Sequence, residues 1–297
     1  MKAVFECLKP ILTSFFQSNC PDTNNHLYLG TSGKKELSIP WPKLIRYVGS
    51  YGSGRAETTH SILIQAIKSG YDVIALFDDH APPIFSLSGI AKETSRSDSV
   101  FVTNMLDCSL ESIRETVSSS GIRCFLTSTE RMNSDRLTKM HDELLMQLIN
   151  YVDELPISGN RLVICLNGVL TRTHNRILSD ELIQTCAAKL VTLIFNDGIS
   201  KHDSSSLLRQ ADCIVVGGAC LNEWQHPYIL DVLSSSGYPF EDLSHFREGM
   251  GIVAYRSFTQ PPILLKAELS YAPFRIGTEQ EVLAAQMNMV TLTSSPP

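Results

Sequence analysis

Short apolar runs alternate along this chain with stretches in which apolar residues recur at helical spacing. Runs such as VIALF, LVICL and CIVV are apolar at consecutive positions, which is typical of parallel strands covered by helices on both faces. The runs predict seven strands: Leu44–Val48, Asp72–Phe77, Val100–Asn104, Arg123–Leu126, Arg161–Leu166, Leu190–Phe195 and Cys213–Val216. The helical spacing predicts six helices: Thr59–Lys68, Leu110–Ser118, Ser134–Val152, Asp180–Lys189, Ser204–Gln210 and Glu223–Leu233. This alternation predicts an α/β fold.

The beginning of the chain lies outside this alternation. Four apolar side chains recur there at helical spacing and predict a short N-terminal helix: Val4, Leu8, Ile11 and Phe15. Residues 17–40 are rich in Asn, Ser, Gly and Pro, so we expect an irregular lead-in to the first long strand.

The end of the chain also changes character. Gly251–Arg256 and Ile263–Leu269 flank a Thr-Gln-Pro-Pro turn, which predicts an antiparallel hairpin at an edge of the sheet. Thr278 and Glu281 form a capping box for a short final helix. These patterns divide the chain into an N-terminal helix and lead-in over residues 1–26, an α/β domain over residues 27–270, and a helix and tail over residues 271–297.

Composition narrows the classes of protein that fit. The 297 residues are 43% hydrophobic and contain no uninterrupted apolar run of the roughly 20 residues that a membrane span needs, so we expect a soluble protein. The net charge of −6 argues against general nucleic-acid binding, which requires a basic surface. The eight cysteines are scattered and form no CxxC pair, which favours buried, reduced thiols in a cytosolic protein over metal or disulfide sites.

The segment after the first long strand has the architecture of a phosphate-binding loop. The strand runs into Gly49-x-x-x-x-Gly54 and a helix follows at once. Glycines allow tight backbone curvature, so that successive amides surround a phosphate at the N-terminus of the helix. The candidate nucleotide-binding loop consists of Gly49, Ser50, Tyr51, Gly52, Ser53, Gly54, Arg55 and Ala56.

The residues after the second glycine do not match the chemistry of such a loop. A lysine that reaches the terminal phosphates and a Ser or Thr that binds Mg²⁺ are required there. The chain has Arg55, whose planar guanidinium does not replace a point charge, and Ala56, which has no oxygen. The carboxylate of Glu57 would repel phosphate. The loop has the shape for phosphate binding but lacks the catalytic groups.

A second element agrees with this interpretation. NTPases of this class carry an apolar strand that ends in an acid holding Mg²⁺, usually with a second acid that activates water. The matching strand, Leu162–Leu166, ends in Asn167 and Gly168. An amide and a glycine replace both carboxylates, so we predict no catalytic residues and no metal site here.

These motifs, in this order, resemble the nucleotide-binding domain of type IV secretion coupling proteins, within the FtsK/HerA group of P-loop motors. The resemblance begins in the stretch YLGTSGKKELSIPWPKLIRYVGSYGSGRAETTHSILIQAIKSGYDVIALFDD and covers about residues 27–270. Asn196 falls where the family has a sensor polar residue, and the C-terminal hairpin is similar to the family's closing hairpin. The resemblance implies a three-layer P-loop NTPase sheet (RecA/FtsK-like) with helices on both faces.

The chain also departs from that family. Coupling-protein motors usually have N-terminal transmembrane helices and a large inserted helical domain, and the segment between Asn104 and Leu162 is too short for that insertion. In size and character the chain resembles soluble accessory subunits of the DotZ type, in Dot/Icm coupling complexes. This resemblance implies a cytoplasmic pseudo-ATPase without cofactor, recruited to the inner face of the bacterial inner membrane. Its partners would be protein subunits of a secretion coupling complex, and we expect no nucleic acid among them. Assembly with further copies of itself, as a homo-oligomer, is an additional option.

Two other interpretations stay open. In the first, the chain is a working nucleotide binder or slow ATPase with ATP and Mg²⁺ as cofactors, and Arg55 together with Thr58 or Thr59 replaces the missing groups. In the second, it is an unrelated α/β enzyme whose glycine loop binds another phosphate.

Overall fold

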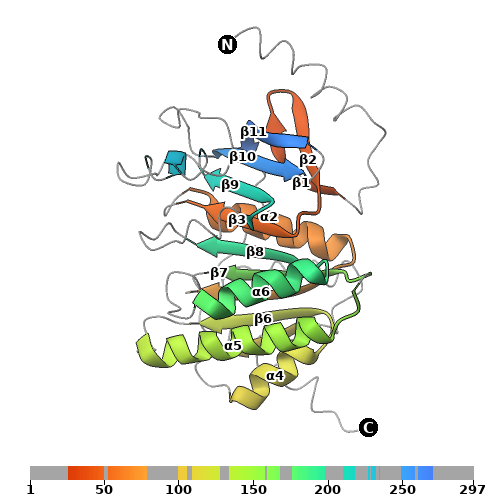
Figure 1. Ribbon diagram of the computed structural model, residues 1–297, viewed down its shortest axis with the longest axis vertical. Helices are drawn as coiled ribbons and strands as arrows, with labels where there is room; N and C mark the ends of the chain where they lie inside the picture. Colours follow the sequence, from red (N-terminus) through yellow and green to blue (C-terminus); the bar gives the residue numbers. More distant parts are fainter. Residues whose placement is uncertain are drawn as a thin grey trace.

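A computed structural model describes residues 26–49, 53–78, 100–105, 109–127, 134–157, 159–167, 176–197, 210–217, 227, 229–231, 234, 249–257 and 260–269. These residues form one sheet with the strand order β2-β1-β11-β10-β9-β3-β8-β7-β4-β6-β5 (Figure 1). The strands are β1 (His26–Ser32), β2 (Lys35–Pro40), β3 (Leu44–Val48), β4 (Asp72–Asp78), β5 (Val100–Asn104), β6 (Ile122–Thr127), β7 (Leu162–Asn167), β8 (Thr192–Asp197), β9 (Cys213–Gly217), β10 (Met250–Ser257) and β11 (Gln260–Leu269). The helices are α2 (Arg55–Lys68), α4 (Leu110–Ser118), α5 (Ser134–Glu154) and α6 (Arg176–Ala188).

Seven strands, in the order β9-β3-β8-β7-β4-β6-β5, run parallel to one another. Helices α4, α5 and α6 cover one face of this parallel part, and α2 covers the other (Figure 1). Successive strand residues point to opposite faces, as Ile164 and Cys165 of β7 do, and both positions are fully buried. The predicted α/β fold with helices on both faces is therefore confirmed.

The other part of the sheet is antiparallel. β10 pairs with both β9 and β11, and β1 pairs with both β11 and β2. The predicted hairpin of β10 and β11 is thus present, but it lies inside the sheet rather than at its edge, because β1 and β2 extend the sheet beyond it.

The prediction of an irregular lead-in was wrong for residues 26–40, which form the β1–β2 hairpin. Four buried side chains alternate there with exposed or half-buried ones: Leu27, Leu29, Leu37 and Ile39. This period of two is the pattern of a half-buried antiparallel strand. Gly33 supplies the positive φ of 63° between the two strands.

Several sequence predictions lie outside the described residues. They are the N-terminal helix, nearly all of the Ser204–Gln210 helix and the final helix with its capping box. The domain boundaries at residues 26 and 270 stay predictions. None of the described helices is long and apolar enough to cross a membrane.

Helix α6 ends in an unusual residue. The amide of Val191 donates to the carbonyl of Cys186 at 2.9 Å, and that of Leu190 donates to the carbonyl of Ala187 at 3.4 Å. This double closure requires a left-handed residue, for which glycine is preferred. Leu190 occupies that position with a φ of 59° and a side chain that is 50% exposed. The conformation is therefore strained, with little burial to offset the strain.

We expect Leu190→Gly to raise the free energy of unfolding by about 1 kcal/mol, because glycine adopts a positive φ without steric cost. Urea unfolding of the two proteins measures the difference. Leu190→Val, which is β-branched, should instead lower the stability. A loss of stability in Leu190→Gly would mean that contacts of the leucine outweigh its strain.

Burial also sets the reactivity of the described cysteines. Desolvation raises the pKa of the Cys124 and Cys186 thiols to about 12, and burial raises the pKa of Cys213 further. Because only the thiolate is nucleophilic, a raised pKa lowers reactivity at neutral pH. We expect iodoacetamide at about pH 8 to label these three thiols only after unfolding in urea. Mass spectrometry of peptides from native and unfolded protein tests this, and fast native labelling of Cys124 would contradict it.

Candidate functional site

The predicted site residues meet at the carboxyl edge of the parallel strands. Strand β8 lies between β3 and β7, and its pairing places Asn196 beside Tyr47 on one side and beside Asn167 on the other. All three side chains share the sheet face that α2 covers, since they alternate with residues of the opposite core. In open α/β sheets ligands bind at this edge. The structure therefore brings together the end of the strand before the loop, Asn196 and the end of the second strand.

The loop leads directly into helix α2. Gly54 precedes the helix with φ 75° and ψ 14°, a left-handed conformation, and no side chain caps the first turn. The first helical hydrogen bond runs from the amide of Thr58 to the carbonyl of Gly54 at 2.9 Å. The amides before Thr58 have no partner within the helix, and such amides attract anions. Ser50, Tyr51 and Gly52 lie outside the described residues.

Ser53 fixes the end of the loop against the sheet. It is only 1% exposed, and its backbone carbonyl accepts a hydrogen bond from the Tyr47 hydroxyl at 3.5 Å. A Cβ atom on Gly49 would lie 2.2 Å from the Ser53 hydroxyl, and one on Gly217 would lie 2.6 Å from the Ser53 carbonyl oxygen. Both glycines are therefore needed for close approach. No local sequence pattern points to Gly217, because its role depends on the pairing of β9 with β3.

Arg55, in the place of the usual lysine, reaches back across the loop. Its Nη1 donates to the carbonyl of Gly49 at 3.3 Å, so the guanidinium contacts the residue at which the loop begins. Ala56 is exposed and Glu57 is half-buried in the first turn of α2. The side chains at the start of α2 thus provide one cation in contact with the loop backbone and one carboxylate.

Both threonines that could replace the missing hydroxyl face the interior. Thr58 is fully buried and Thr59 is 3% exposed. Asn196, at the end of β8, is 2% exposed. Within the described structure, neither threonine hydroxyl nor the Asn196 Oδ1 has a hydrogen-bond partner. These side chains form a buried polar layer under the start of α2, whereas Asn167 is half-buried at the strand end. Gly168 lies outside the described residues.

The described residues do not fit a magnesium-bound nucleotide. The position that would supply the hydroxyl ligand is Ala56, and the strand-end position that would supply the acid is Asn167. No group of three or more His, Cys, Asp or Glu side chains that could hold a metal is found among the described residues. The edge therefore offers amides and an arginine to an anion, and its strand-end position has the neutral amide of Asn167 in place of a carboxylate.

No protein-family model matches the chain, and no curated protein matches it. Solved structures do match. The unbound bacterial conjugative coupling protein TrwB is similar with a TM-score of 0.54 at 10% identity, over 90% of this chain and 92% of that one. TrwB in complex with the GTP analogue GDPNP gives a TM-score of 0.54 at 10% identity, over 91% and 94%. The chain shares its α/β fold with a conjugative coupling protein.

A viral protein is also similar. The genome packaging NTPase B204 from Sulfolobus turreted icosahedral virus 2 gives a TM-score of 0.49 at 13% identity, over 77% of this chain and 100% of that one. Because the chain and TrwB are only 10% identical, their similarity concerns the fold alone. It agrees with the expected α/β fold, a mostly parallel sheet with helices on both faces.

The contact between Ser53 and Gly49 leads to a double-mutant prediction. We expect Gly49→Ala to lower the free energy of unfolding by about 1–3 kcal/mol, because the new methyl group overlaps the Ser53 side chain. In a Ser53→Gly background that side chain is gone, so the same substitution should cost clearly less. Urea unfolding of the four proteins gives the coupling energy. Additive effects would show that the two side chains do not compete for this space.

Proposed function

We propose that this protein is a non-catalytic structural or adaptor subunit, a pseudo-ATPase, of a type IV secretion coupling complex. It supports the export of substrate or effector proteins through contacts with other protein subunits. The observation that carries the proposal is the pair of replacements in a coupling-protein fold: Ala56 at the hydroxyl position and Asn167 at the acid position. Its place is the cytoplasmic face of the bacterial inner membrane.

The physical reason is that phosphoryl transfer by such proteins depends almost entirely on positioning and on stabilisation of charge by Mg²⁺. Of the two ligand positions at this edge, Ala56 has no side-chain oxygen and Asn167 has a neutral amide in place of a carboxylate. The contact of Arg55 with the Gly49 carbonyl adds to this, because the guanidinium already has an acceptor within the loop. A subunit of this kind can pack beside its neighbours without turning over nucleotide.

A second candidate function is a nucleotide-binding or slow ATPase component of a secretion or conjugation motor, with ATP and Mg²⁺. It is favoured by the uncapped N-terminus of α2, where amides attract phosphate, and by the similarity to TrwB with GDPNP. The burial of Thr58 and Thr59 disfavours it, because either hydroxyl would have to leave the interface between α2 and the sheet to reach a metal.

Calorimetric titration with Mg-ATP separates the two functions. We expect no heat of binding for the natural chain, because Ala56 has no hydroxyl for Mg²⁺ and Asn167 has no charged carboxylate. The triple variant Arg55→Lys/Ala56→Thr/Asn167→Asp restores the three groups and serves as a positive control for Mg²⁺-dependent binding. Tight binding by the natural chain that needs Mg²⁺ and is lost in Arg55→Ala would overturn the pseudo-ATPase proposal.

The adaptor role has its own test. The tagged protein, purified from its native cells after cross-linking, should carry other components of a type IV secretion coupling complex. A purification that contains none of them, with the tagged protein absent from the inner-membrane fraction, would overturn this role whatever the titration shows.

A further inference from the structure

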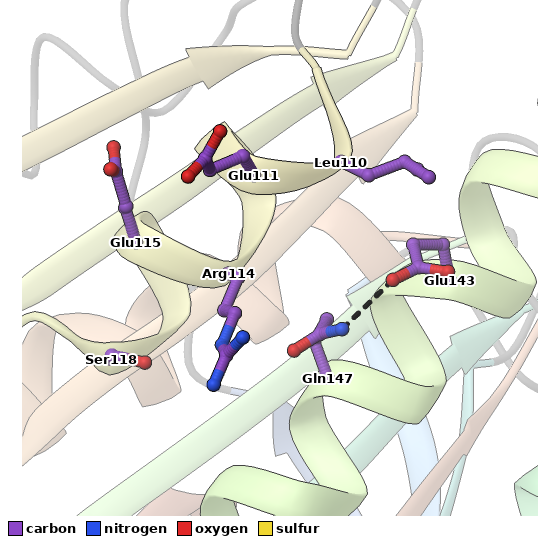
Figure 2. Close-up of a pocket in the computed structure, with 7 residues that line it drawn as sticks. All are labelled: Leu110, Glu111, Arg114, Glu115, Ser118, Glu143 and Gln147. Atoms are coloured by element: carbon purple, nitrogen blue, oxygen red, sulfur yellow. Dashed lines mark hydrogen bonds between the residues drawn. The ribbon is translucent and has the colours of Figure 1, made fainter.

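Helices α4 and α5 lie next to each other on one face of the sheet (Figure 1). An open groove lined by residues of both helices lies between them (Figure 2). The groove consists of two adjoining cavities of about 530 and 340 Å³. Both cavities are lined by Arg114 and Ser118 from α4 and by Gln147 from α5. Figure 2 shows the Arg114 guanidinium in the space between the two helices, opposite Gln147. The groove lies on the side of the sheet that α4 and α5 cover, whereas α2 covers the other side. It is therefore separate from the candidate nucleotide site.

The groove is polar because of the spacing of residues on both helices. Its lining residues fall at intervals of three and four, which places them on one face of each helix. They are Leu110, Glu111, Arg114, Glu115 and Ser118 of α4, and Glu143, Gln147, Asn150, Tyr151, Asp153 and Glu154 of α5. The other faces of the helices bury apolar residues such as Ile113 and Leu148 against the sheet. Both helices therefore use their apolar faces to pack on the sheet, and their polar faces line the groove.

A buried arginine of the sheet contacts both helices. Arg123 of β6 is fully buried, and its Nη1 donates to the carbonyl of Val117 at 2.7 Å and to that of Ser119. The guanidinium carbon lies 5.2 Å from the ring centroid of Tyr151 on α5. One side chain thus joins the C-terminal ends of α4 and α5 to the same strand. Helices fixed in this way need less ordering when a partner binds, which reduces the entropic cost of binding.

The charge of the groove selects its occupant. Five carboxylates line it and Arg114 is the only cation among the lining residues. One of these carboxylates, that of Glu143, accepts a hydrogen bond from the Gln147 amide at 2.8 Å (Figure 2). A surplus of negative charge attracts lysine and arginine side chains and repels nucleic acid.

The dimensions suit an extended peptide. From Glu143 to Glu154 the axis of α5 advances by about 16 Å at 1.5 Å per residue. About five residues of extended chain cover this length at 3.3 Å each. Gln147, Asn150 and Ser118 supply donors and acceptors for a peptide backbone. Leu110, which is 54% exposed, offers an apolar contact at one end.

We propose that the α4–α5 groove binds a short extended segment of a protein partner that is rich in lysine or arginine and has an apolar residue against Leu110. The inference rests on the proposed adaptor function, since it names the chemistry of a protein partner. Its test involves no nucleotide, so the two proposals fail independently.

Fluorescence anisotropy with a labelled peptide of one leucine and four lysines tests the proposal on the full chain. The variant Glu111→Gln/Glu115→Gln/Glu154→Gln removes three exposed carboxylates from the groove and should weaken binding about ten-fold. The control variant Glu36→Gln/Glu181→Gln/Asp231→Asn removes three exposed carboxylates elsewhere and should change binding less than about two-fold. Equal weakening by both variants would reduce the effect to net charge and overturn the proposal.

A steric variant tests the groove without a change of charge. Ser118 is exposed and lines both cavities, so Ser118→Trp fills the groove while the protein stays folded, which circular dichroism checks. We expect loss of peptide binding in this variant. Unchanged binding, or equal binding of a peptide with glutamate in place of lysine, would each overturn the proposal.

Discussion

Strand β3 is fastened at both ends, and the rest of the site depends on this. At its beginning, the carboxylate of Asp212 accepts hydrogen bonds from the amides of Lys43 and Leu44, both at 3.0 Å. Burial raises the pKa of this carboxyl group, and the two amides act in the opposite direction. At its end, Ser53 packs on the glycine that follows the strand. With both ends fixed, the start of α2 can lie in only one place over the sheet.

The same strand is held by packing that is independent of any ligand. All five residues of β3 are buried, and its neighbours β8 and β9 cover it on both sides within the sheet. These contacts consist of backbone pairing, apolar side chains and the fully buried Arg46, whose Nη1 donates to the carbonyls of Tyr47 at 2.9 Å and Phe195 at 3.4 Å. Neither Ala56 nor Asn167 takes part in them. The packing of β3 therefore does not depend on which side chains stand at these two positions.

Much of the parallel part could be predicted from the sequence, because each strand there is apolar at consecutive positions and each helix has one apolar face. Helix α4 was predicted with the observed bounds, and Ser109 caps it by accepting from the amide of Ser112 at 3.1 Å. The β1–β2 hairpin was not predicted, because the segment is rich in residues that favour turns and its alternation of apolar and polar positions is short. The direction of Arg55 and the closeness of Gly217 to Ser53 depend on tertiary packing, which no local pattern reports. The same holds for the groove, because it requires the relative position of two helices.

The pairing of β1 with β11 has a consequence for synthesis on the ribosome. Gly30 lies opposite Leu269, so the first described strand finds its partner in the last one. Nearly the whole described chain must be made before this ladder can close, and contacts between such distant segments slow folding. Until then the buried residues of the β1–β2 hairpin have only part of their final cover. In a nascent chain the edge of β1 that pairs with β11 is still unpaired, and such an edge can pair with the wrong strand. Binding by chaperones during translation would reduce this mispairing.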